Sequence, residues 1–158
     1  MAKGETAAQR YLRLNGFKGT FREVPVPKDR KTSALEMAEA SGIDPARLFK
    51  TLIIEADDGK LAVAIVPASR ELDRKALARV IGTKRIDLAP KHKAVKMSGY
   101  QMGACSPLGQ KKPLPTFLDA SAESFETIYV SGGAYGLELE IAPADLLRAT
   151  GGHAAVIA

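Results

Sequence analysis

The stretch LFKTLIIEADDGKLAVAIVP, residues 48–67, decides the fold. It contains two runs of aliphatic and β-branched residues, 48–56 and 61–67, on either side of Asp57-Asp58-Gly59-Lys60. Aspartate followed by glycine between two such runs is typical of a β-hairpin, because both residues tolerate the backbone angles of a tight turn. The sequence therefore predicts an antiparallel hairpin near the middle of the chain.

Helical and extended patterns alternate irregularly on both sides of this hairpin. Helices are predicted over residues 5–15, 73–81 and 91–97, and from Pro143 to about Gly151. A further helix is predicted to begin at a capping box formed by Ser33 and Glu36 and to end at Gly42. Short strands are predicted over residues 20–26, 116–120, 127–131, 136–141 and 153–157, with loops over 27–32 and 98–115. Because no regular βαβ repeat connects these elements, we expect an α+β fold with a mixed sheet. No linker or internal repeat divides the chain, so residues 1–158 are predicted to form a single domain.

The composition is that of an ordinary globular protein, with 46% hydrophobic and 26% charged residues among 158. This argues against a mostly disordered chain. No run approaches the roughly 20 apolar residues of a membrane span, and the first ten residues lack the apolar centre of a signal peptide. One cysteine and two histidines exclude an internal disulfide and a cysteine-rich zinc site. We therefore expect a cytoplasmic protein with no membrane contact and no metal.

Basic residues gather in the middle of the chain. Residues 70–112 hold eleven lysines and arginines against three acidic residues, whereas residues 113–158 hold one against six. A concentration of positive charge of this kind favours a surface that binds a polyanion such as nucleic acid. A lysine-rich helix face exposed to solvent would give the same pattern, so charge alone leaves both interpretations open.

Lys50 is unusual because the alternation of a strand puts it on the same face as Leu52 and Ile54. Lysine is rarely buried without a partner. One interpretation is that Lys50 extends its ammonium group to water from the beginning of the strand. The other is a cation at the edge of a cleft, where it would bind a phosphate or a developing oxyanion.

Two glycine-containing segments could line a ligand site. They are GYQMGACSPLGQKK at 99–112 and YVSGGAYGLE at 129–138, where Ser131 precedes a glycine turn. Glycine lets the backbone approach a ligand closely, and successive N–H groups can face an anion, although structural turns would look the same. Cys105 fits a small buried hydrophobic residue better than a nucleophile, since His92 and His153 are both remote in sequence.

Three segments taken together resemble the YbaK/EbsC family: FKTL at 49–52, GYQMGACSPLGQKK at 99–112 and TIYVSGG at 127–133. Leu72-Asp73 and LELEI at 137–141 also fit, and the resemblance runs from about Thr6 to the end of the chain. It implies a mixed, barrel-like sheet flanked by helices, a fold shared with the editing insertion domain of bacterial prolyl-tRNA synthetases.

The resemblance also implies a trans-editing aminoacyl-tRNA deacylase that clears mischarged tRNA, foremost Cys-tRNA(Pro). In this family the thiol of the substrate cysteine is thought to attack its own carbonyl, so that no enzyme nucleophile and no cofactor is needed. Two alternatives stay open: a deacylase for alanine or another small amino acid, and a non-catalytic module that binds tRNA or a synthetase. The implied partners are tRNA(Pro) and, in a complex, prolyl-tRNA synthetase.

The family's functional residues fall on specific positions of this chain. The catalytic positions are Lys50, Gly103 and Ser131, and N–H groups around Gly103 and Ala104 would face the substrate carbonyl. The positions implied for substrate binding are Val26, Ala104, Gly132 and Glu138. The lysines implied for tRNA binding are Lys91, Lys93, Lys96, Lys111 and Lys112.

This sequence departs from the family pattern at four positions. Val26 stands where tyrosine is common, Ala104 replaces the second glycine of a pair, Cys105 replaces an aliphatic residue, and Glu138 stands where aspartate is common. The first two changes alter the expected pocket, so they leave the preference for cysteine open.

Overall fold

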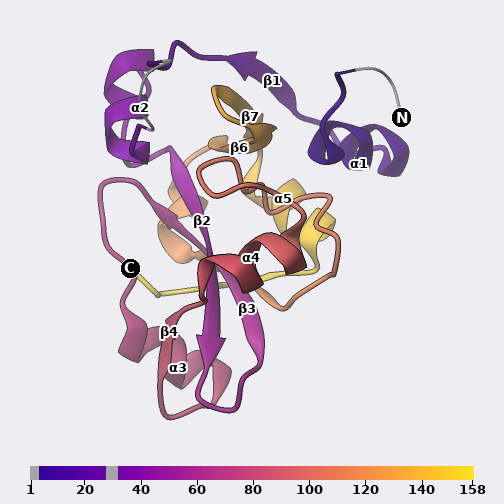
Figure 1. The fold of residues 1–158 in the computed structure, drawn as a ribbon. Helices are drawn as coiled ribbons and strands as arrows, with labels where there is room; N and C mark the ends of the chain where they lie inside the picture. The colour runs from indigo at the N-terminus through magenta and orange to yellow at the C-terminus, as the bar shows by residue number, and fades with distance from the viewer. Residues whose placement is uncertain (1–3, 28–31) are drawn as a thin grey trace.

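The computed structural model describes residues 4–27 and 32–158 (Figure 1). The elements follow the order α1 (Ala7–Asn15), β1 (Thr20–Glu23), α2 (Ala34–Ser41), β2 (Phe49–Ala56), β3 (Leu61–Pro67), α3 (Arg74–Ile81), β4 (Ile86–Leu88), α4 (Lys91–Ser98), β5 (Thr116–Asp119), the 3-10 helix η1 (Ala120–Ser124), β6 (Ile128–Ala134), β7 (Leu137–Ile141), α5 (Pro143–Thr150) and β8 (His153–Ala155). The predicted α+β class is confirmed. Most of the loop predicted over residues 27–32 lies outside the described residues.

The predicted hairpin is present and forms the longest pairing of the fold. β2 and β3 run antiparallel from Phe49 opposite Pro67 to Glu55 opposite Leu61. Within the turn, the N–H of Gly59 donates to the carbonyl of Ala56, and Gly59 adopts a φ of 85°. This positive φ is one that glycine reaches without steric cost, which explains why the turn forms at this point in the sequence.

The strands form two separate sheets. β4-β2-β3-β5-β8 make one sheet, in which β3 pairs in parallel with β5 and β5 in parallel with β8. β1-β7-β6 make the other, which is antiparallel. An isolated parallel bridge between Leu48 and Tyr129 connects the two. The described residues form no closed barrel, because neither sheet pairs its own edge strands.

Helix ends agree closely with their sequence signals. Ser33 caps α2 together with Glu36 in the predicted capping box, and α2 ends at Gly42 as expected. Two short elements, β4 and η1, were not predicted, because three to five residues are too few for a periodic pattern. β1 is shorter than the run predicted over residues 20–26.

β2 separates two apolar clusters and thereby places its two faces in different surroundings. Phe49 and Ile53 point into a large cluster that includes Val130 and Leu139 of the smaller sheet. Ile54 points into a second cluster, against α3. Since full burial of one such side chain contributes about 1.5–3 kcal/mol, these contacts hold the position of β2 firmly. Figure 1 shows α2 near the beginning of β2 and α3 near its other end.

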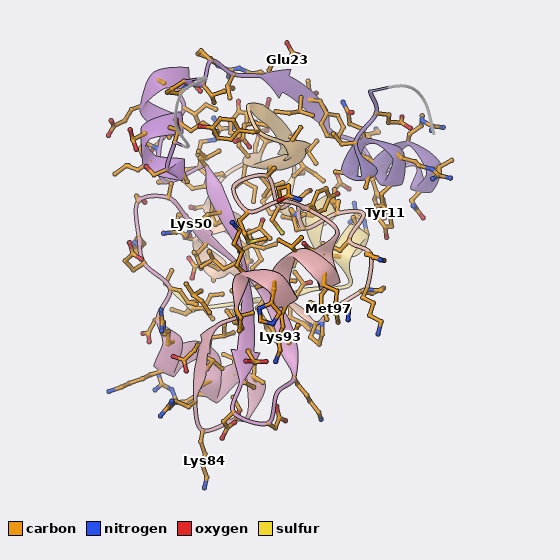
Figure 2. All side chains as sticks on the ribbon, in the orientation of Figure 1. Tyr11, Glu23, Lys50, Lys84, Lys93 and Met97 are labelled. Carbon is orange, nitrogen blue, oxygen red and sulfur yellow. The ribbon has the colours of Figure 1, made fainter. Side chains whose placement is uncertain are left out.

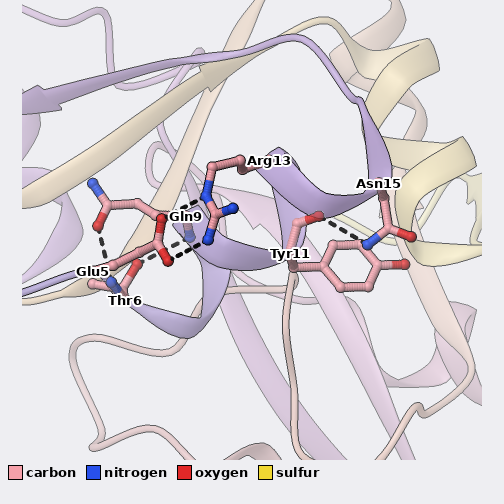
Figure 3. Close-up of polar contacts among 6 residues, drawn as sticks. All are labelled: Glu5, Thr6, Gln9, Tyr11, Arg13 and Asn15. Carbon is pink, nitrogen blue, oxygen red and sulfur yellow. Dashed lines mark hydrogen bonds and ion pairs between the residues drawn. The ribbon is translucent and has the colours of Figure 1, made fainter. Parts of the chain in front are cut away.

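Helix α1 connects to two later parts of the chain, and Figure 3 shows the contacts within the helix and its cap. Thr6 caps the helix in a capping box with Gln9, and its hydroxyl also donates to the carbonyl of Gly132, 2.7 Å away. At the other end of α1, the hydroxyl of Tyr11 donates to the carbonyl of Ala149 in α5 at 2.8 Å. None of the helices in residues 4–27 and 32–158 has the length and apolar character needed to cross a membrane.

Candidate active site

A cavity of about 350 Å³ opens beside the first half of β2. The beginning of α2, β2, the loop after α4 and the smaller sheet all contribute to its wall. The lining residues are Thr32, Ser33, Ala34, Met37, Leu48, Phe49, Lys50, Thr51, Leu52, Met102, Gly103, Cys105, Ser131 and Glu138.

Three polar atoms in this wall are buried without a hydrogen-bond partner: Thr32 Oγ1, Thr51 Oγ1 and Glu138 Oε2. Among the described residues only two further side-chain atoms are in this condition, on Ser41 and Ser121. Each unsatisfied polar group costs about 1–3 kcal/mol. Their concentration in one cavity indicates a place where a polar ligand would supply the missing partners.

Lys50 lies at the rim of this cavity, near the beginning of β2 (Figure 2). Its side chain is 25% exposed, and its Nζ is 3.8 Å from Oε2 of Glu71. The carboxylate of Glu71 is 96% exposed, and an ion pair with so exposed a partner contributes little. The ammonium group therefore stays available to an anionic ligand.

Ser131 and Glu138 face the cavity from neighbouring strands, where they stand directly opposite each other. A bulge follows Ser131, and within it the N–H of Gly133 donates to Ser131 Oγ at 3.1 Å. Gly133 has a φ of 98°, and a Cβ there would lie 2.9 Å from the ring of Tyr100. Glycine is therefore required at the position that orients the Ser131 hydroxyl.

Glu138 is the buried carboxyl group of the cavity, with 6% of the residue exposed. Burial raises the pKa of Glu138 to about 8, because the carboxylate is poorly solvated. Arg22, opposite Glu138 on β1, donates instead to the carbonyl of Ser41. Glu138 is therefore mostly protonated at neutral pH.

The loop after α4 forms one lip of the cavity through Met102, Gly103 and Cys105. The N–H of Gly103 makes no hydrogen bond to any described residue, whereas the N–H of Ala104 donates to the carbonyl of Gln101 at 3.1 Å. The prediction that both N–H groups face the substrate is therefore wrong for Ala104, whose N–H closes a turn.

The described residues that line the cavity include no activated nucleophile. Cys105 is 7% exposed, and burial raises the pKa of its thiol to about 11, so the thiolate is scarce at neutral pH. His92 and His153 are exposed and do not line the cavity. Within the described ranges, no three His, Cys, Asp or Glu side chains come together as a metal site.

The structure brings four of the seven residues implied for catalysis and substrate binding into the cavity wall: Lys50, Gly103, Ser131 and Glu138. Val26, Ala104 and Gly132 are not part of it. Val26 packs against Gly136, and the carbonyl of Gly132 accepts the hydroxyl of Thr6. Thr32, Thr51 and Met37 were not predicted as site residues, because a local sequence pattern does not show which side chains will line a cavity or which hydroxyl will lack a partner after folding.

The lysines predicted to bind tRNA lie on α4 and on the segment beside its end. The N–H groups of Lys111 and Lys112 donate to the carbonyls of Ser98 and Met97, which holds this segment against α4. All five lysines are exposed, but the ammonium of Lys93 is bonded to Glu55. The other four, Lys91, Lys96, Lys111 and Lys112, have no ion pair among the described residues.

Comparisons with known proteins agree on one family. Residues 28–149 match the family described as the aminoacyl-tRNA editing domain. An Enterococcus faecalis protein, provisionally named Cys-tRNA(Pro)/Cys-tRNA(Cys) deacylase EbsC, is 38% identical over 125 residues, which cover 79% of this chain and 76% of that protein. A proline–tRNA ligase of Moorella thermoacetica is 33% identical over 120 residues, 76% of this chain but only 19% of the ligase. A crystal structure provisionally described as a trans-editing enzyme for prolyl tRNA synthetase superposes with a TM-score of 0.83 at 25% identity, covering 96% of this chain and 94% of that one.

Proposed function

Because the chain belongs to the aminoacyl-tRNA editing domain family, we propose that it is a trans-editing aminoacyl-tRNA deacylase whose foremost substrate is Cys-tRNA(Pro). The reaction is cleavage of the ester between the amino acid and the terminal ribose of the tRNA. Removal of the wrong amino acid before it reaches the ribosome would protect the accuracy of translation. We propose that it takes place in the cytoplasm, where the mischarged tRNA arises.

The observation that carries this proposal is the cavity with three unsatisfied polar atoms and a lysine at its rim. An aminoacyl ester is already an activated bond, so a site can accelerate its cleavage by positioning and by electrostatic stabilisation. Lys50 is suited to hold the ribose-phosphate end of the tRNA. The unbonded N–H of Gly103 is suited to stabilise the carbonyl oxygen as it becomes negative.

The absence of an activated nucleophile in the described cavity wall supports attack by the substrate's own thiol. Its sulfur would form a bond to the carbonyl carbon, while the ester C–O bond breaks and its electrons pass to the ribose oxygen, which takes up a proton. The products are a cyclic thioester of cysteine and tRNA with a free terminal hydroxyl. A thiol is a far better nucleophile than a hydroxyl near neutral pH, which would favour cysteine over serine.

We further propose that the unpaired lysines on and beside α4 contact the tRNA backbone. The chain passes from the end of α4 directly into the cavity lip at Met102 and Gly103, so a tRNA held by these lysines could extend its acceptor end into the cavity. Related stretches occur within proline–tRNA ligases, which makes such a ligase the first candidate for a complex.

The test is release of labelled amino acid from Cys-tRNA(Pro), Ala-tRNA(Pro) and Ser-tRNA(Pro) at catalytic protein concentration, with chromatography of the products. We expect rapid release of cysteine as the cyclic thioester, with serine and alanine released slowly. The Lys50→Met variant provides the background rate of a folded but impaired protein.

Other outcomes would replace parts of the proposal. Rapid release of both serine and alanine would indicate an activated water and a pocket that selects by size. Binding of all three tRNAs without any release above the spontaneous rate would make the chain a binding module and overturn the enzymatic assignment.

A further inference from the structure

We infer that Glu138 is the receptor for the α-ammonium group of the aminoacyl ester, as a carboxylate that pairs with this cation inside the cavity. The inference rests on the proposed function, since it names the part of the substrate that occupies one wall of the same site. It also assigns to Glu138 a selective role that distinguishes an aminoacyl ester from an ester without a free amine.

The carboxyl group of Glu138 is buried without a partner. Glu138 is 94% buried, it lines the cavity, and its Oε2 has no hydrogen-bond partner. A buried carboxyl group without a partner is costly, and buried charges are ordinarily paired. Since this atom belongs to a cavity wall, a ligand can supply the partner that the protein does not.

The described cations beside this cavity are not bonded to Glu138. Arg22, opposite on β1, bonds to the carbonyl of Ser41, and Lys50 lies at the rim with the exposed Glu71 as its described ion-pair partner. From the remaining elements the cavity presents Met37 of α2, the neutral thiol of Cys105 and the hydroxyl of Ser131. Among the described residues, no positive charge is therefore bonded to Glu138.

The same strand face offers an internal comparison at Glu140, two residues further along β7. Its carboxylate accepts the hydroxyl of Thr127 and forms an ion pair with Arg47 at 3.4 Å. The fold thus supplies a cation and a hydroxyl to the carboxylate outside the cavity, and neither to the carboxylate inside it. A structural glutamate at position 138 would be expected to have partners of the kind that Glu140 has.

An ammonium group matches the requirement of Glu138 in charge and in hydrogen bonding. It provides three N–H donors and a positive charge, and charge-assisted hydrogen bonds of this kind are roughly twice as strong as neutral ones. Burial raises the pKa of Glu138, and a bound ammonium would lower that pKa again because it would stabilise the carboxylate. The α-ammonium is the cationic group common to all aminoacyl esters.

The kinetic test compares an aminoacyl-tRNA with its α-hydroxyacyl counterpart, for example cysteinyl-tRNA(Pro) with the ester in which a hydroxyl replaces the amine. We expect Glu138→Gln to lower kcat/KM for the amine substrate by about 10–100-fold and to change cleavage of the hydroxy substrate by less than about twofold. Glu140→Gln, two residues away on the same face, is the matched control and should lower neither rate. An equal loss on both substrates, or no loss on either, would overturn the inference.

A second test does not depend on catalysis. The carboxyl group of Glu138 is followed by ¹³C NMR in the wild-type protein, with Glu138→Gln identifying its signal, while a stable amide analogue of alanyl-adenosine is added. We expect the titration midpoint to fall by about 1–3 pH units with this probe and to stay unchanged with the lactyl analogue. If no deacylation occurs but the midpoint falls with the amine probe alone, the inference stands and the proposed function fails. If saturating amine probe leaves the midpoint unchanged, the inference fails whatever the activity.

Discussion

The two ends of β2 lie in opposite chemical conditions. At its beginning, beside the cavity, the hydroxyl of Thr51 lacks a partner and Lys50 meets only the exposed Glu71. At its other end a larger hollow of about 640 Å³ lies among charged side chains, but its carboxylates have protein partners: Glu55 bonds to Lys93, Asp57 to the hydroxyl of Thr83, and Asp87 lies 3.2 Å from Arg74. Figure 2 shows Lys50 near the first end and Lys84 beyond the second.

Volume and charge therefore do not by themselves identify a site. The larger hollow is more polar, yet its carboxylates already have protein partners and gain little from a ligand. The smaller cavity retains unsatisfied groups, which the fold keeps at a cost in stability. We expect this contrast to correspond to function at the first end of β2 and to structure at the other.

The largest effect is expected from Lys50→Met. Loss of the single preorganised charge that holds the ribose-phosphate end beside the ester should lower kcat/KM for deacylation by about 10²–10³-fold. The matched control is Lys93→Met, which removes a lysine already bonded to Glu55 and should leave single-turnover cleavage of bound substrate unchanged. Equal losses of the cleavage rate in the two variants, measured by single-turnover kinetics at saturating protein, would show that the two ends of β2 do not differ in function.

The next effect concerns stability and its dependence on pH. The pKa of Glu138 is about 8 in the folded protein against an ordinary 4.5, so the folded state holds a proton that the unfolded state has lost. The contribution of this group to stability is therefore fully present below pH 4.5 and is lost as the pH rises to about 8. Glu138→Gln avoids this loss and should be more stable than wild type by about 2–4 kcal/mol at pH 8, but not at pH 4.5.

Urea unfolding at pH 4.5, 6.5 and 8 measures this difference directly. The free energies of unfolding of the two proteins should diverge as the pH rises. If the free energies of unfolding of the two proteins stay parallel as the pH changes, Glu138 is already ionised in the folded protein. Its carboxylate would then resemble the paired carboxylates at the other end of β2.

A smaller effect is expected for tRNA affinity. Each lost phosphate contact to a single-stranded acceptor end reduces the slope of log K against log salt by about 0.7, so replacing Lys91, Lys96 and Lys112 together by alanine should flatten it by about 2. Lys93→Ala removes a lysine neutralised by Glu55 and should change the slope much less. Filter binding between low and moderate salt measures the slope for both variants. An unchanged slope in the triple variant would mean that these lysines form an ordinary solvent-exposed surface and do not contact tRNA.

The smallest effect is expected for Cys105→Ala. Since burial keeps this thiol protonated, it should react slowly with iodoacetamide, and its removal should change deacylation by less than about twofold. Loss of activity in a variant that still unfolds cooperatively would make the chain a thiol enzyme, and would contradict attack by the substrate's own sulfur.

The sequence was informative where local chemistry decides structure. The Asp-Gly turn of the hairpin and the capping box at Ser33 could be predicted because each depends on a few neighbouring residues. The parallel pairing of β5 with β3 and β8 could not, since it joins segments that are distant in sequence. The division of the strands into two sheets could not be predicted for the same reason, because a hydrophobic pattern does not show which strands will pair.

The site shows the same division. Lys50, Ser131 and Glu138 could be identified because they occupy motif positions of a recognisable family, and the structure brings them to one cavity. Thr51 could not, because its lack of a partner depends on what packs around it. The N–H of Ala104 was misjudged for a related reason: turn geometry, which residue identity did not reveal, decides where an N–H points.

Helix α1 and the two terminal strands bear on how this fold could be transplanted. The span that matches the family, residues 28–149, excludes α1, β1 and β8, yet β1 pairs with β7 and β8 with β5. The loop that forms the cavity lip presses its Gly109 so closely against α1 that a Cβ would lie 2.5 Å from the carbonyl oxygen of Ala7. A graft of residues 28–149 alone would transfer the cavity lining to a new host protein without α1, β1 and β8, which pack against or pair with the segments that carry this lining. The smallest unit that can be transplanted therefore extends from α1 to β8.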